Sequence, residues 1–119
     1  MSHPDLGEQV AAELARALQA AQAGNHGKSR VCARRAAGWS LGGTPATWAG
    51  GPEGRPGNAY QALQSAAMDE ALPPHIRLAA SRLTARVDEA FSLPFDQDPL
   101  QDALEIIRWR WPGWQTPAI

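Results

Sequence analysis

The chain has 119 residues, a formal net charge of −1 and a single cysteine. This length suffices for one domain with a single core. The near-neutral charge excludes a strong overall attraction to nucleic acid or membrane surfaces, and a lone cysteine excludes an intramolecular disulfide. The first residues lack the basic region and apolar run of a signal peptide, and no apolar run reaches the roughly 18 residues of a membrane span. We therefore expect a cytoplasmic protein with no membrane association.

The first part of the chain predicts a helical hairpin. Apolar residues recur at helical spacing over residues 4–23. Gly24 suits the left-handed residue that ends a helix, and Asn25 suits the cap of a second helix over residues 26–41. Because the link is short, the two helices should be antiparallel neighbours.

A segment rich in glycine and proline follows over residues 42–58. It cannot form a regular helix or a central strand, so we expect a long crossover loop. Trp48 lies within it, and a large aromatic residue in a loop either fills the core or meets a partner.

The remainder of the chain predicts three more helices. They cover residues 59–69, 74–90 and 99–111. Pro74 suits the first turn of the second of these, and Asp98 with the following proline suits the start of the third. In the first of them, Met68 is expected to face inward. Residues 114–119 should form a loose tail. Valine and isoleucine are scarce, which argues against a sheet, so the prediction for residues 1–119 is one all-α domain of about five helices.

The helix over residues 26–41 has two unlike faces in projection. Alanines, Cys32 and Trp39 cluster on one side, which we expect to be buried against the helices over residues 4–23 and 74–90. Cys32 should therefore be buried rather than reactive. The other side is basic and carries Lys28, Arg30, Arg34 and Arg35.

Residues for catalysis or metal binding are not grouped in the sequence. His3, His26 and His75 are not at metal-ligand spacing, and no phosphate-binding glycine loop is present. Asp98 and Asp102 are one turn apart, but a helix cap and a favourable first-turn charge account for them. We expect neither a cofactor nor a metal.

Tryptophan is unusually frequent near the end of the chain. Trp109, Arg110 and Trp111 lie within one segment, and Trp114 follows. Residues 109 and 111 are about 200° apart on a helix, so one of them should be exposed or lie in an interface. This segment could complete the core and an oligomer contact, bind a partner protein, or stack on nucleic-acid bases.

The segment ALQAAQAGNHGKSRVCARRAAG resembles the opening helix pair of HEPN-type domains, which are small bundles of four or five antiparallel helices. NAYQALQSA and DPLQDALEII fit the later helices of that family, so the resemblance covers most of residues 5–110. Tetratricopeptide hairpins share a similar rhythm of Ala, Leu and Gly. Many HEPN proteins are RNases that use an arginine followed within a few residues by histidine, and neither His26 nor His75 follows an arginine in this way. The resemblance therefore implies the non-catalytic branch, whose members are binding or accessory modules.

These observations favour a non-enzymatic interaction or accessory protein that associates with itself or with a protein partner. One alternative is nucleic-acid binding through the basic side of residues 26–41, with Arg77, Arg82 and Arg86 alongside. Another is an enzyme whose site is assembled from scattered residues. The candidate interaction surface comprises Lys28, Arg30, Arg34, Arg35, Trp48, Trp109, Arg110, Trp111 and Trp114.

Overall fold

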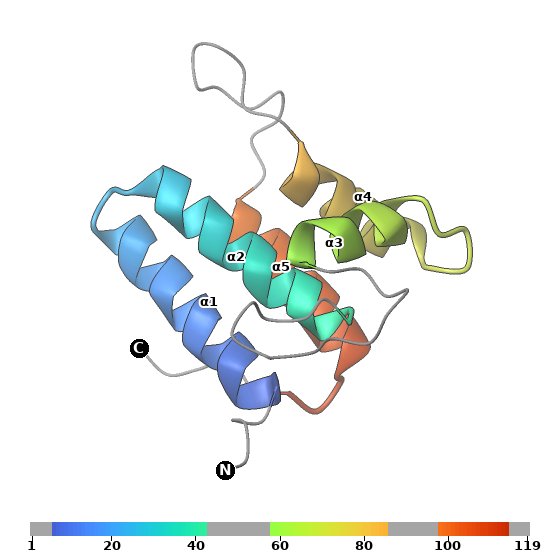
Figure 1. The fold of residues 1–119 in the computed structure, drawn as a ribbon, viewed down its shortest axis with the longest axis horizontal. Coiled ribbons are helices and arrows are strands. Elements are labelled where there is room, and N and C mark those ends of the chain that lie inside the picture. The colour runs from blue at the N-terminus through green and yellow to red at the C-terminus, as the bar shows by residue number, and fades with distance from the viewer. Residues whose placement is uncertain (1–5, 43–57, 86–97, 115–119) are drawn as a thin grey trace.

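Every regular element that the structure describes is an α-helix. The computed structural model describes residues 6–42, 58–85 and 98–114, and these ranges contain five helices and no strand. The helices gather in one bundle (Figure 1). The predicted all-α fold of about five helices is therefore confirmed. Trp48 and most of the predicted crossover loop lie outside the described residues.

The first two helices form a hairpin. Helix α1 runs over Leu6–Gln22 and α2 over His26–Ser40. Gly24 follows α1 with a positive φ of 78°, a conformation that residues with a Cβ rarely adopt. Asn25 caps α2, because its side-chain oxygen accepts a hydrogen bond from the backbone N–H of Lys28. Both local signals act as the sequence predicts.

The next two helices form a second pair. Helix α3 runs over Ala59–Ala67 and α4 over Pro74–Thr84. Asn58 caps α3 by accepting a hydrogen bond from the backbone N–H of Gln61 at 2.9 Å. Pro74 occupies the first turn of α4, where its missing N–H costs nothing. Both helices start where the sequence predicts, and α3 ends slightly earlier than predicted.

The end of α4 differs from the prediction. The apolar periodicity predicts a helix over residues 74–90, but Ala85 has extended dihedral angles (φ −64°, ψ 143°) and the helix ends at Thr84. At this point the Arg30 side chain of α2 donates hydrogen bonds to the backbone carbonyls of Arg82 and Ala85. A helix leaves its last carbonyls without partners inside the helix, and here a side chain from another helix binds two of them. The rest of the predicted extension lies outside the described residues.

The last helix agrees with its predicted limits to within a residue. Helix α5 runs over Pro99–Arg110. The carboxylate of Asp98 accepts a hydrogen bond from the backbone N–H of Leu100 at 2.9 Å, so Asp98 is the cap. Trp111 then leaves the helical conformation and ends the helix.

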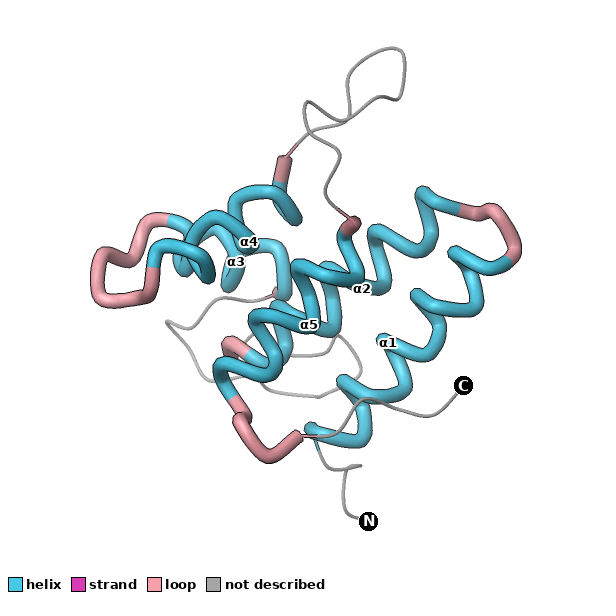
Figure 2. Tube along the Cα trace, turned by 180° about the vertical axis from the view of Figure 1, so that it is seen from behind, coloured by secondary structure: helices cyan, strands magenta, loops and turns pink. Residues whose placement is uncertain are grey.

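Helix α2 lies at the centre of the bundle and contacts all four other helices. Figures 1 and 2 show α1 on one side of α2, the α3–α4 pair on the other, and α5 crossing one face. The main neighbours of α2 are α1, α5 and α3, whereas α4 touches it far less. The expectation that α2 packs against α1 and α4 is therefore right for α1, whereas α4 contributes only a small contact and α5 and α3 pack against α2 more extensively. Larger aliphatic side chains of the other helices complete the core: Val10, Leu14, Leu63, Ile76, Leu83, Ile106 and Ile107.

A glycine allows α3 to approach α2 closely. Gly38 is buried, and a Cβ at this position would overlap the backbone and the Cβ of Ala59 at the start of α3. Gly38 lies one turn after Arg34, on the side of α2 that the sequence pattern predicts to be exposed. Helix α3 therefore covers part of that side.

Replacing Gly38 with alanine should lower the free energy of unfolding by about 1–3 kcal/mol, because the added methyl group forces α3 away from α2. Urea unfolding monitored by circular dichroism would measure this change. Gly27→Ala in the same helix is the control, since a Cβ there meets no atom within 4 Å. That control should be neutral or slightly stabilising, because alanine favours helices more than glycine does. Equal stability of the two variants would contradict the close contact.

Candidate interaction surface

The basic residues of α2 do not form one exposed face. Lys28 and Arg35 are exposed, Arg34 is half-buried, and Arg30 is only 7% exposed. The prediction that all four lie on a solvated surface is therefore wrong for Arg30. The reason is that neighbouring helices surround α2 on most of its circumference, as the contacts of α2 show.

Each arginine of α2 interacts with a different neighbouring helix. Arg30 donates two hydrogen bonds, of 2.6 and 2.9 Å, to carbonyls at the end of α4. The guanidinium of Arg34 lies 5.5 Å from the ring centre of Tyr60 in α3, within the range of a cation–π contact. Arg35 pairs with Glu13 of α1 at 3.8 Å. The three arginine side chains thus connect α2 to three helices. Lys28, the fourth basic residue of this helix, takes part in none of these contacts.

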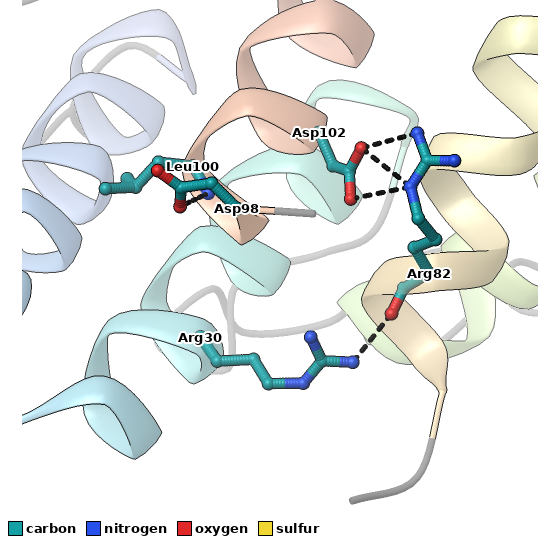
Figure 3. A network of polar contacts seen from close by, with 5 residues as sticks. All are labelled: Arg30, Arg82, Asp98, Leu100 and Asp102. Carbon is teal, nitrogen blue, oxygen red and sulfur yellow. Dashed lines mark hydrogen bonds and ion pairs between the residues drawn. The ribbon is translucent and has the colours of Figure 1, made fainter. Parts of the chain in front are cut away.

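A buried ion pair joins α4 to α5. The Nε of Arg82 donates to both carboxylate oxygens of Asp102 at 3.1 Å, and its Nη2 donates to Oδ1 at 2.8 Å. Figure 3 shows this pair together with Arg30, which reaches the carbonyl of Arg82 from α2. Asp102 is 1% exposed, and the side chain of Arg82 is 25% exposed. Asp102 lies in the first turn of α5, as the sequence predicts, but its burial and its pairing with Arg82 were not predicted.

The electrostatics of Arg30, Arg82 and Asp102 indicate a structural role. Burial raises the pKa of Asp102, while the hydrogen bonds and charge of Arg82 act in the opposite direction. The hydrogen bond to Asp102 raises the pKa of Arg82, so the guanidinium stays protonated. Burial lowers the pKa of Arg30, and the charge of Arg34 adds to this effect. Because the carboxylate already accepts three hydrogen bonds, this network is suited to holding helices together rather than to acid–base catalysis.

Replacing Arg82 with methionine should lower the free energy of unfolding by about 3 kcal/mol or more, because it leaves the buried carboxylate of Asp102 without its partner. Asp102→Asn should cost less, since it removes the buried charge and leaves an arginine that can turn toward water. Urea unfolding would compare the two variants. Lys28→Met, at an exposed position, is the control and should change stability by no more than about 0.5 kcal/mol. If Arg82→Met were no more destabilising than this control, the ion pair would not contribute to stability.

The single cysteine is buried between α1 and α2, as the sequence predicts. Cys32 is 3% exposed. Burial, followed by a hydrogen bond with Glu13 and the charge of that carboxylate, raises the pKa of the thiol. Glu13 is itself 4% exposed and pairs with Arg16 at 3.1 Å as well as with Arg35. A protonated, buried thiol is a poor nucleophile, so Cys32 has a packing role.

The raised pKa of Cys32 predicts a loss of stability at alkaline pH. The unfolded chain releases the thiol proton near the ordinary value of 9.0, whereas the folded chain retains it. Above this pH the unfolded state binds fewer protons than the folded state, so stability falls as pH rises, by at most about 1.4 kcal/mol per pH unit.

Urea unfolding of the wild type and of Cys32→Ala at about pH 8 and about pH 10 would measure this contribution. The wild type should lose more stability over the interval than the variant does. Identical losses in the two proteins would show that the thiol titrates in the same way in both states. Labelling of Cys32 by a thiol reagent should likewise be slow in native buffer and fast in denaturant.

The described tryptophans divide between the core and the surface. Trp39, Trp111 and Trp114 are half-buried and pack against the core, whereas Trp109 is 37% exposed. The prediction that Trp109 and Trp111 cannot both face the core is therefore confirmed. Arg110, between them, is exposed.

Three large apolar side chains are exposed in the part of the chain that the structure describes. Met68 is 82% exposed, Leu78 58% and Trp109 37%. Met68 was expected to face inward, but α3 ends just before it, so the helical projection no longer applies at this residue. Sequence reasoning missed Met68 as a surface residue for this reason.

Two of these side chains lie beside charged residues, one beside a basic residue and the other beside acidic residues. The basic spot consists of Trp109 and Arg110 at the end of α5, and both residues are exposed. The acidic spot consists of Met68, Asp69 and Glu70, three exposed residues in the turn between α3 and α4. These spots lie at separate corners of the bundle (Figure 1).

Neither a metal cluster nor a membrane helix is found among the described residues. They contain no group of three or more His, Cys, Asp or Glu side chains placed to hold a metal ion. His26 and His75 are both exposed. No described helix has the length and apolar character needed to cross a membrane.

No protein-family model, curated protein or solved structure matches this chain. The resemblance to HEPN-type domains therefore rests on the sequence alone.

Proposed function

We propose that this chain is a non-enzymatic interaction module that associates with a second copy of itself. The observation that carries the proposal is the complementarity of the two spots. Each exposes a large apolar side chain beside a charge, and the charges are of opposite sign. Tryptophan, methionine and arginine are the residue types enriched in protein interfaces.

A two-fold arrangement would use both spots of both copies. The basic spot of one protomer faces the acidic spot of its partner, and the reverse contact follows by symmetry, so the assembly closes as a dimer. In this contact Trp109 packs against Met68 of the second copy, an attraction of about 0.3–1.5 kcal/mol for sulfur on an aromatic ring. Arg110 lies opposite Glu70, which favours this orientation over its alternatives.

The positions of the arginines give less support to nucleic-acid binding through α2. Arg30 is buried, and Arg34 and Arg35 already interact with α3 and α1. Phosphate binding by Arg30 would require breaking two short hydrogen bonds. The resemblance to non-catalytic HEPN-type domains agrees with a binding or accessory role and adds no substrate.

Charge reversal tests the proposal. Sedimentation of the wild type over a range of concentrations should reveal a monomer–dimer equilibrium. Arg110→Glu and Glu70→Arg should each weaken the dimer by tenfold or more, which corresponds to about 1.4 kcal/mol. The double variant, in which the charges are exchanged, should regain most of the lost affinity.

Lys28→Glu is the matched control, since Lys28 is an exposed basic residue outside both spots. It should leave the dimer unchanged. A wild type that is monomeric at every concentration, or a double variant that shows no recovery, would contradict the proposal. Retarded mobility of RNA at low salt, lost in Lys28→Glu, would favour nucleic-acid binding instead.

A further inference from the structure

The amino-acid sequence around the end of α4 contains neither a proline nor a glycine that would end the helix. Ala85 is the residue type with the highest helix propensity, and the next proline in the chain is Pro94. Asparagine and glycine, the usual residues after a helix end, are absent from residues 85–90. Nevertheless α4 ends at Thr84 and Ala85 is extended. Thr84 makes a local contribution, because its hydroxyl donates to the carbonyls of Ala80 and Ser81 at 3.0 and 3.1 Å. A contact from outside α4 acts at the same point.

The Arg82 carbonyl shows how a contact from outside α4 acts on the end of this helix. The carbonyl of Arg82 accepts the Nη2 of Arg30 at 2.6 Å and the backbone N–H of Ala85 at 3.3 Å. In a longer α-helix this carbonyl would instead accept an N–H from four residues further along the chain. The Ala85 N–H would then bond the Ser81 carbonyl, but Arg30 would still occupy the Arg82 carbonyl and compete with the helical N–H for it.

The second hydrogen bond of Arg30 depends on the extended conformation of Ala85. The same Nη2 donates to the Ala85 carbonyl at 2.9 Å while ψ of Ala85 is 143°. A helical residue has ψ near about −42°, which would turn this carbonyl roughly half a revolution away. Arg30 can thus hold both carbonyls only when α4 stops at Thr84.

We propose that Arg30 is a latch that ends α4 from outside, and that its release allows the helix to continue through Ala85. The latch joins three helices: Arg30 belongs to α2, the two carbonyls belong to the end of α4, and the side chain of Arg82 holds Asp102 of α5 (Figure 3). The burial of Arg30 keeps water from competing for the two carbonyls. The fold therefore contains two possible ends for α4, and the position of one side chain selects between them.

Nuclear magnetic resonance of the whole chain tests this inference through Ala85. In the wild type, the 13Cα shift of Ala85 should lie upfield of its random-coil value, as in extended backbone. In Arg30→Met, which keeps the length of the side chain and removes the donors, the shift should move downfield into the helical range. Arg34→Met is the control, because Arg34 contacts Tyr60 and not α4, and it should leave Ala85 extended.

An extended Ala85 in a folded Arg30→Met protein would overturn the inference, and so would a helical Ala85 in the wild type. A second measurement covers the case in which Arg30→Met does not fold. In the wild type, the Nη protons of Arg30 should give separate, slowly exchanging signals, because two carbonyls hold the guanidinium. Signals averaged by free rotation, like those of an exposed arginine, would equally overturn it.

Discussion

The all-round packing of α2 is the constraint on which the rest of this bundle depends. Four helices contact α2, and most of its buried positions are small, with alanine at 33, 36 and 37 and glycine at 38. A large side chain at Gly38 would meet the backbone of α3 rather than a flexible side chain that could move away. Leucine and isoleucine side chains of the surrounding helices fill the space beside these small residues. The burial of each stabilises the fold by about 1.5–3 kcal/mol.

This packing also explains why α2 is basic. A charge that is taken out of water needs a partner, since burying it alone costs several kcal/mol. Three of the four helices around α2 supply such a partner, each in a different chemical form: backbone carbonyls of α4 for Arg30, the ring of Tyr60 for Arg34 and the carboxylate of Glu13 for Arg35. The cluster of arginines that suggests a ligand in the sequence is thus largely used within the fold.

The features that could be predicted from the sequence are those whose cause lies within a few residues. Asn25 and Asn58 each cap a helix by accepting an N–H three residues ahead, so both caps are visible as local patterns. The bond from Arg30 to the Arg82 carbonyl spans 52 residues, and no pattern of spacing reveals it. Glu13 left a weaker signal, because it lies three residues after Val10 and four before Ala17, on the apolar stripe of α1 where an acid needs a partner. Helical projection predicted that one of Trp109 and Trp111 is exposed. It could not predict the exposure of Met68, because projection fails where a helix has ended.

The ion pair between Arg82 and Asp102 gives the two spots a defined relative position. Residues 102 and 109 are seven apart and therefore lie on nearly the same side of α5. Asp102 is buried and Trp109 is exposed, so the neighbours that cover the first do not fully cover the second. The pair fixes the rotation of α5 against α4 and thereby the direction in which Trp109 faces. The acidic spot lies in the turn that leads into α4, the same helix that carries Arg82. Both spots are attached to helices joined by one buried ion pair, so a second copy would meet them at a fixed separation. A two-fold contact needs this fixed separation, because its two symmetry-related contacts must form at the same time.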